Sequence, residues 1–294
     1  MIYLVDASVY VFRAHYSGLP DMPDADGNPG HAVFGFARLL GDLIEQVRPR
    51  HIAVAFDQAV ASFRSALYPA YKAHREPAPA GIGLQFARCF EFCALAGIAA
   101  FGSERYEADD IIGTLAQRMR ERGVRTTVVT RDKDLAQLIR EGDIYWDYTG
   151  REPLGYEAVA RRFGVAPERF ADYLALTGDA VDNIPGVPGV GPKTAAVLMR
   201  EFDSLEALFA GLGRVSALPV RGAAALAARL SAHREAAYLA RSLTRIACDM
   251  PLGIEPEALE RRAPQLPALE VFFDRQGFGP LLRRQAQRLA QLPC

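Results

Sequence analysis

Short apolar segments that lead to an acidic residue recur along the first half of the chain. They are Ile2–Val5 before Asp6, Ile52–Phe56 before Asp57, Ile98–Phe101 ahead of Glu107, and Arg125–Thr130 ahead of Asp132. Their length and composition predict buried strands. Helical patterns separate them, and this alternation is typical of an α/β fold with a mostly parallel sheet. Because ligands bind at the carboxyl ends of such strands, we expect the acids to gather at that edge.

The helical patterns extend through the whole chain. The expected helices are Val33–Val47, Leu84–Leu95, Tyr156–Phe163, Phe170–Leu176 and Ala195–Phe202, and Ile144–Tyr148 is expected to add a strand. Another helix face begins at Ile111. The segment Arg283–Leu292 carries no recognisable chemistry and is predicted to be a solvated helix.

Glu107, Asp109 and Asp110 stand where the helix containing Ile111 is expected to begin. One acid at a helix start commonly caps it or interacts with its dipole, for about 0.3 to 1 kcal/mol. Three acids within four residues are more than capping a helix requires. Crowded carboxylates repel one another unless cations neutralise them, and hard oxygen ligands favour Mg²⁺ or Mn²⁺. The sequence therefore predicts a metal site.

Further acids extend this prediction. Asp132 and Asp134 follow the Arg125–Thr130 strand, and Asp179 and Asp182 are spaced so that both could face one ion. Without the nine acids of the predicted site, 26 of the 35 acidic residues remain against 34 basic ones. The net charge of −1 thus hides a basic remainder, as a phosphate-binding surface requires.

The start of the chain has no basic signal region, and no apolar run of about 18 residues occurs in the sequence. We therefore expect a cytoplasmic protein without a membrane span. Cys89 and Cys93 could share a helix face, but nearby phenylalanines favour a place in the core over metal binding.

The segment Ser62–Pro79 interrupts the α/β alternation with basic and aromatic residues. They are Arg64, Tyr68, Tyr71, Lys72, His74 and Arg75. Cations that neutralise phosphates, together with rings that stack on bases, suit a nucleic-acid channel. Taken by itself, the segment fits a solvated amphipathic helix equally well.

The segment Gly186–Thr194, GVPGVGPKT, joins two expected helices. Gly186, Gly189 and Gly191 allow tight turns and a close approach to phosphate, which the following N–H groups and Lys193 can hold. A simple turn would explain one or two of these glycines. Their full spacing matches the hairpin of a helix-hairpin-helix, which grips duplex DNA without reading bases.

In these motifs the chain resembles the 5′-nuclease of bacterial DNA polymerase I and the wider flap endonuclease family. The resemblance runs from about Asp6 to Phe209, through VDASVYVFRA, AVFGF, FRSALYPAYKAHR, YEADDIIGTLA, TRDKDLAQL and LTGDAVDNIPGVPGVGPKTA. It implies a PIN-like α/β nuclease domain over residues 1–170, with a helical arch near 62–90. A helix-hairpin-helix DNA-binding domain over 171–260 and a helical tail over 261–294 would follow.

The resemblance also implies roles for particular residues. Asp6, Asp57, Glu107, Asp109 and Asp110 match the first metal site, and Asp132, Asp134, Asp179 and Asp182 match the second. Asp57 and Asp132 would be essential for catalysis, together with Lys72 and Arg75, which match the basic pair at the base of the arch. Tyr71 would stack on a base or hold the arch. Gly186, Gly189, Gly191, Lys193 and Thr194 would contact DNA, and family hairpins often hold K⁺.

The chain departs from the family pattern in three places. No polymerase domain follows, so we expect a free-standing nuclease. Arg131 replaces the usual glycine before DKD and would tighten a phosphate contact or crowd the second metal. The segment after Arg75 is rich in alanine, glycine and proline where relatives commonly have acidic residues.

We therefore expect a monomeric nuclease that uses two Mg²⁺ or Mn²⁺ ions. Its expected substrates are 5′ flaps, nicked or gapped duplexes, and RNA of primer hybrids, cut to leave a 5′ phosphate and a 3′ hydroxyl. Two alternatives stay open. A phosphatase for small molecules could share the acids but would not need the hairpin, and a non-catalytic DNA binder would not need nine acids.

Overall fold

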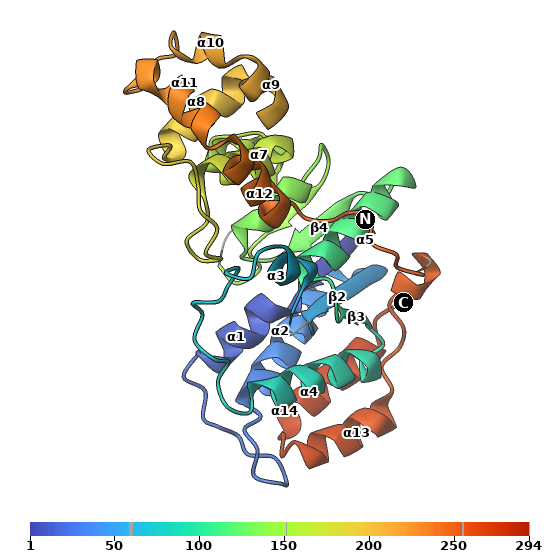
Figure 1. Ribbon diagram of the computed structural model, residues 1–294. Helices are drawn as coiled ribbons and strands as arrows, with labels where there is room; N and C mark the ends of the chain where they lie inside the picture. The colour runs from blue at the N-terminus through green and yellow to red at the C-terminus, as the bar shows by residue number, and fades with distance from the viewer. Residues whose placement is uncertain (59–60, 151, 255, 294) are drawn as a thin grey trace.

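The computed structural model describes residues 1–58, 61–150, 152–254 and 256–293. It consists of a larger lobe around a sheet and a smaller lobe of helices (Figure 1). Cys294, the last residue of the expected tail, lies outside the described residues. No helix in the described ranges is long and apolar enough to cross a lipid bilayer.

A six-stranded sheet has the order β3-β2-β1-β4-β5-β6. Its strands are β1 Ile2–Asp6, β2 His51–Asp57, β3 Ala99–Ser103, β4 Thr126–Val129, β5 Ile144–Trp146 and β6 Leu154–Gly155. All pairs are parallel except β5 with β6, so the predicted mostly parallel sheet is confirmed. The strand order reverses between β1 and β4, the position at which open α/β sheets bind ligands.

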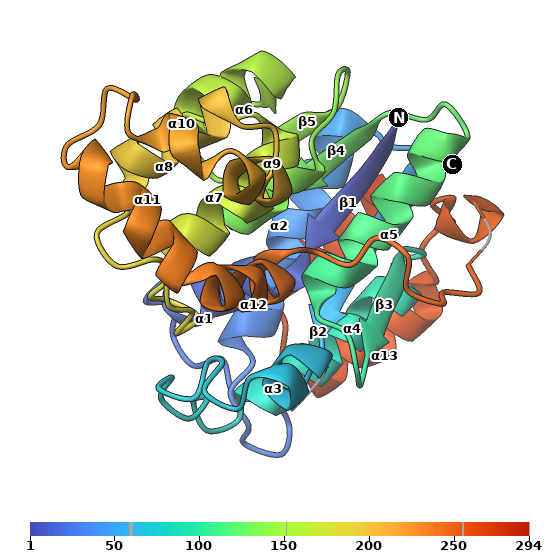
Figure 2. The ribbon, with the colours of Figure 1, turned by 45° about the horizontal axis from the view of Figure 1, so that its top comes forward.

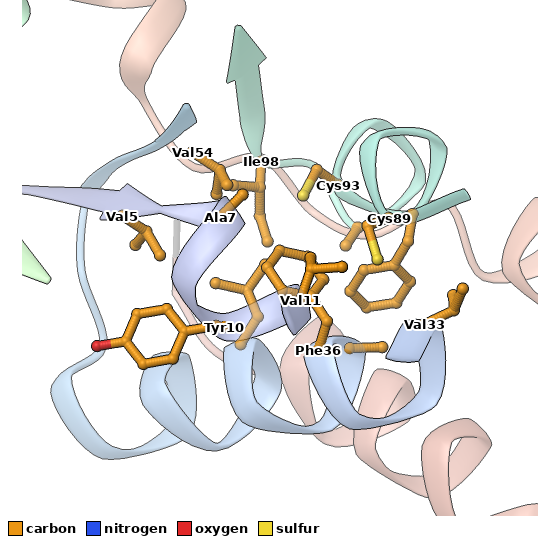
Figure 3. Close-up of a cluster of buried hydrophobic side chains, with 14 of the residues drawn as sticks. Val5, Ala7, Tyr10, Val11, Val33, Phe36, Val54, Cys89, Cys93 and Ile98 are labelled. Carbon is orange, nitrogen blue, oxygen red and sulfur yellow. The ribbon is translucent and has the colours of Figure 1, made fainter. Parts of the chain in front are cut away.

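Helices cover both faces of the sheet (Figure 2). On one side lie α1 (Ala7–His15), α2 (His31–Val47) and α4 (Ile82–Leu95), and on the other lies α5 (Ala108–Glu121). Alternate residues of β2 serve the two layers, because Val54 joins the core with α1 and Ala55 the core with α5. Cys89 and Cys93 are fully buried in the first of these cores, which confirms the prediction for them (Figure 3).

The smaller lobe has its own hydrophobic core. Its helices are α7 Phe170–Thr177, α8 Pro192–Glu201, α9 Leu205–Ala210, α10 Leu212–Val215, α11 Ala223–Ala232 and α12 Arg234–Thr244. The helix α6 (Tyr156–Phe163) and the short 3₁₀ helix η2 (Pro167–Arg169) connect it to the sheet. The predicted pair of helices around GVPGVGPKT is therefore present as α7 and α8.

After α12 the chain returns along α5 to the sheet lobe (Figure 2). It ends in the 3₁₀ helix η3 (Pro256–Leu259), α13 (Leu266–Arg275) and α14 (Pro280–Ala290). The prediction of a solvated terminal helix is wrong, because Leu282 and Leu289 are buried in the first core. The apolar residues of α14 lie on one face of the helix, and that face packs against α2. The proposed domain boundaries at 170 and 260 stay a prediction.

Candidate active site

Asp6 and Asp57 end the neighbouring strands β1 and β2. Asp6 is buried, and its Oδ2 accepts a hydrogen bond of 2.9 Å from the Thr130 hydroxyl. Asp57 accepts hydrogen bonds of 2.7 Å from the Ser8 hydroxyl and 2.8 Å from the Ala108 N–H. Burial and then the negative charges of Asp57 and Asp132 raise the pKa of Asp6 to about 7. The structure thus brings these strand-end acids together, as expected.

Glu107 and Asp109 approach Asp6 and Asp57 from the beginning of α5. Glu107 precedes the helix and accepts hydrogen bonds of 2.6 Å from Ser62 and 2.7 Å from the Lys72 ammonium. Burial, followed by the negative charges of Asp132, Asp6 and Asp57, raises the pKa of Asp109 well above its ordinary value. Asp109 therefore lies among the acids from three strand ends.

Asp110 does not join this group, which contradicts its predicted role as a metal ligand. Its carboxylate is fully buried and makes a bidentate pair with Arg64, at 2.7 and 2.8 Å. The N–H groups of Glu107 and Ala247 donate two further hydrogen bonds, at 3.0 and 2.8 Å. Four donors occupy the roughly four lone-pair positions of a carboxylate, so none is left for a cation.

The second predicted group of acids contains residues from both lobes. Asp132 and Asp134 follow β4, whereas Asp179 and Asp182 lie in the connection between α7 and α8. Lys133 links them, since its ammonium lies 2.5 Å from the Asp179 carboxylate and 3.4 Å from that of Asp134. Burial and then the charge of Asp132 raise the pKa of Asp134 to about 7. Repulsion from Asp182 acts on Asp132, so all four acids lie near one another.

The basic residues of the Ser62–Pro79 segment face these acids. The Lys72 ammonium lies 2.7 Å from Glu107 and 3.7 Å from Asp182. Arg75 donates to the Asp182 carboxylate at 2.5 Å. The Lys72 backbone has a φ of 55°, a left-handed conformation, and its N–H donates to the Asp182 carbonyl. The segment is thereby held between α5 and the α7–α8 connection, with both cations beside the carboxylates.

Cations of the chain already contact several of these carboxylates, whose oxygens are the possible ligands of a metal ion. Among the residues that the structure describes, no three histidine, cysteine, aspartate or glutamate side chains are arranged to hold one ion. Lysines instead contact Glu107 and Asp179 in this arrangement. Asp134 Oδ1 is buried and accepts no hydrogen bond from the described chain, and its nearest cation is the Lys133 ammonium at 3.4 Å. Carboxylate oxygens are the ligands that hard divalent cations favour, and burial with neighbouring acids raises the pKa values of Asp6, Asp109, Asp132 and Asp134. A cation would relieve this crowding of negative charge, so the residues fit the expected metals.

Tyr71 and Arg131 make contacts that differ from part of what the sequence predicted. Tyr71 is buried, and its hydroxyl lies 3.1 Å from a carboxylate oxygen of both Glu107 and Asp182, between which it shares its single proton. These contacts contradict base stacking and leave the other expected role, holding the arch segment. Arg131 is exposed and points to Asp147, 3.4 Å away, rather than to the second group of acids.

The hairpin between α7 and α8 has features of a backbone-binding turn. Gly189 has a φ of 76°, and Lys193 is exposed beside Thr194 in the first turn of α8. Gly186 has a different reason for its small size, because a Cβ there would meet the Thr177 carbonyl carbon at 2.3 Å. The residues predicted to contact DNA thus lie together, and Gly186 also permits close packing against the end of α7.

Several side chains that hold the acids were missed by the sequence reading. The first group of acids consists of Asp6, Asp57, Glu107 and Asp109. Three of them accept a hydrogen bond from a hydroxyl, which belongs to Ser8, Ser62 or Thr130. Lys133 bridges the second group. Arg64 was named among the cations of a possible nucleic-acid channel, but it is buried and pairs with Asp110 instead. The place of Lys133 inside TRDKDL was the only sequence signal for it. The sequence gives no such signal for Ser8, Ser62 and Thr130, because serine and threonine commonly cap helices and turns.

Two family models match this chain. The model described as "5′-3′ exonuclease, N-terminal resolvase-like domain" matches residues 1–164, and "5′-3′ exonuclease, C-terminal SAM fold" matches residues 165–267. A 5′-3′ exonuclease of Aquifex aeolicus is 33% identical over 269 residues, which cover 92% of this chain and 89% of that protein. DNA polymerase I of Rhizobium leguminosarum is 36% identical over 293 residues, 97% of this chain but 28% of the polymerase.

Solved structures with low sequence identity share the fold. The T5 D15 protein co-crystallised with metal ions has a TM-score of 0.68 at 19% identity, covering 99% of this chain and 98% of that one. The catalytic core of Rad2 in complex with a DNA substrate has a TM-score of 0.63 at 15% identity, covering 98% and 91%. The whole chain, including α13 and α14, therefore follows an architecture seen before.

Proposed function

This chain belongs to the 5′-3′ exonuclease family, and on that premise we propose that it cuts DNA near 5′ ends by metal-dependent phosphodiester hydrolysis. The observation that carries the proposal is the gathering of carboxylates from both lobes beside Lys72 and Arg75. They lie at the edge of the sheet where the strand order reverses.

We propose two sets of metal ligands, and the proximity of the acids within each set supports them. Asp6, Asp57, Glu107 and Asp109 would hold one ion, and Asp132, Asp134, Asp179 and Asp182 the other. Bound Mg²⁺ or Mn²⁺ would lower the pKa of an attacking water and stabilise charge on the leaving 3′ oxygen. Cleavage would leave a 5′ phosphate and a 3′ hydroxyl. Asp110 is left out of this assignment because Arg64 and two N–H groups occupy it.

Lys72 and Arg75 would position the scissile phosphate. Both pair with carboxylates that metal ions would neutralise, so their charge would then be available to the substrate. A fixed cation beside the phosphate stabilises the charge that develops in the transition state. Tyr71 keeps the two residues in place through its hydrogen bonds to Glu107 and Asp182.

The hairpin would hold the duplex part of the substrate. The N–H groups at the start of α8, with Lys193 and Thr194, can bind backbone phosphates without reading sequence. Its carbonyls are also the proposed K⁺ site. We further propose 5′ flaps, nicked or gapped duplexes and primer RNA as substrates, and a cytoplasmic monomer as the working form.

The test is cleavage of a fluorescent 5′-flap oligonucleotide in Mg²⁺, with EDTA and a blunt duplex as controls. The expected result is cleavage of the flap in Mg²⁺ alone, lost in Asp57→Ala and Asp132→Ala. Both variants should still bind the flap in Ca²⁺. Turnover by either variant would remove its residue from the assignment. Binding without cleavage by the wild type would favour a DNA clamp, and hydrolysis of small phosphate esters alone would favour a phosphatase.

A further inference from the structure

Arg64 lies where the two lobes meet. It belongs to the short helix α3 (Phe63–Leu67) and is buried, with an exposed fraction of 3%. Its Nε donates to the Leu243 carbonyl at 2.8 Å, and one terminal nitrogen donates to the Arg245 carbonyl at 3.0 Å. These carbonyls belong to the end of α12 and the residue that follows it. One guanidinium therefore binds the last helix of the smaller lobe.

The same guanidinium binds the first turn of α5. Both of its terminal nitrogens donate to Asp110, which also accepts the N–H groups of Glu107 and Ala247. Glu107 is thus tied to the pair through its own backbone, and its carboxylate lies 3.8 Å from Arg64. Asp109 precedes Asp110 in the same turn, so its direction depends on how that turn is fixed.

We propose that Arg64 and Asp110 form a positioning pair for the first metal site. The pair fixes the start of α5 against the end of α12 and so sets the directions of Glu107 and Asp109. Neither residue touches the metal or the substrate. The inference rests on the proposed function, because it concerns the ion that Glu107 and Asp109 would hold.

A purely structural ion pair can also bury its carboxylate, and the chain contains such a pair, in which the arginine is more exposed than Arg64. Asp143 is buried with an exposed fraction of 4% and pairs with Arg120 at 2.9 Å. It also accepts the Thr126 N–H at 2.8 Å. Asp143 precedes β5, at the edge of the sheet opposite to the acids. Asp143→Asn therefore controls for the loss of a buried, arginine-paired carboxylate at a distance from the site.

The experiment measures Mn²⁺ binding by calorimetry and by electron paramagnetic resonance, without DNA. The variants are Asp110→Asn, Arg64→Lys, Asp143→Asn and Asp109→Asn, each checked for folding by circular dichroism. If Asp110→Asn fails to fold, the double variant Arg64→Gln/Asp110→Asn replaces it, because it leaves no single buried charge. Flap cleavage supplies kcat and KM for the same proteins.

The expected result is that Asp110→Asn and Arg64→Lys keep the number of bound ions but weaken first-site affinity by about 10- to 100-fold, as loss of a group that orients ligands does. Their kcat at fixed Mn²⁺ should fall while KM for the flap stays unchanged. Asp143→Asn should keep both constants, and Asp109→Asn should lose the ion.

Two results would overturn the positioning role. If folded Asp110→Asn loses the first ion as Asp109→Asn does, Asp110 is a ligand. If Asp110→Asn or its double replacement, together with Arg64→Lys, keeps wild-type affinity and kcat, the pair is only structural. A wild type that binds no Mn²⁺ and cuts no flap overturns the proposed function and this inference together. If the wild type binds Mn²⁺ and cuts the flap, the proposed function stands, and the variants alone then decide whether the pair positions the ligands.

Discussion

The two groups of acids differ in how the chain builds them. Asp6, Asp57 and Asp109 belong to the sheet lobe, where hydroxyls and an amide support Asp6 and Asp57. The second group takes Asp179 and Asp182 from the other lobe, and a lysine joins the halves. The first group thus takes all its acids from the sheet lobe and meets α12 only through Arg64 and Asp110, whereas the second group takes two of its four acids from the other lobe. We expect the two sites to respond differently to mutation, pH and metal removal.

The largest expected difference concerns catalysis. Asp109→Asn should lower kcat for flap cleavage by about 10³-fold, because the charges that act most strongly on Asp109 are those of three acids, with Lys72 acting less, and a metal ion would be its main partner. Asp179→Asn should cost about 10²-fold, since Lys133 already neutralises part of the Asp179 charge. Single-turnover rates at saturating Mg²⁺ would measure this, with Asp143→Asn as control. Equal losses would mean that the sites are not built differently.

Metal removal should make stability depend on pH. The pKa values of Asp6 and Asp134 are raised to about 7, so the folded protein binds protons more tightly than the unfolded chain between about pH 4 and pH 7. Stability in EDTA should therefore fall as pH rises through this window and stay low above it. The melting temperature at pH 8 should be on the order of 5 °C below that at pH 5.5.

Adding Mg²⁺ should remove most of that difference, because the ion binds only the folded, ionised site. Asp6→Asn and Asp134→Asn should each flatten the profile in EDTA, so the two groups can be compared. Differential scanning fluorimetry across pH supplies the measurement. A profile in EDTA that is already flat for the wild type would contradict the crowding of buried carboxylates.

The smallest expected effect belongs to the lysine that joins the lobes. Lys133→Met should lower the melting temperature in EDTA by about 1 to 3 °C, because its ion pairs are partly exposed and partly screened. Mg²⁺ should then stabilise the variant more than the wild type, since the second group has lost its internal cation. Lys193→Met, at an exposed lysine of the other lobe, is the control. A variant as stable as the wild type in EDTA would show that Lys133 does not join the lobes.

Much of this architecture follows from local patterns. The run Ile52–Phe56 alternates between two buried layers, and an acid follows it, so strand, sheet type and the edge that gathers the acids could be predicted. The spacing of GVPGVGPKT likewise predicted the turn between two helices. In each case the information lies in neighbouring residues, because strand and turn preferences are set by local sterics and side-chain burial.

The roles of individual residues depended on contacts between distant parts of the chain. Asp110 and Asp109 are adjacent acids in one motif, but only the folded chain places Arg64 and the Ala247 N–H on one of them. From the sequence, Tyr71 could equally have stacked on a base. The structure instead places its hydroxyl beside Glu107 and Asp182. The α14 helix was predicted as a helix, yet its burial required the face of α2. Sequence spacing determines which elements form, whereas the partner of a polar or apolar side chain is decided by long-range packing.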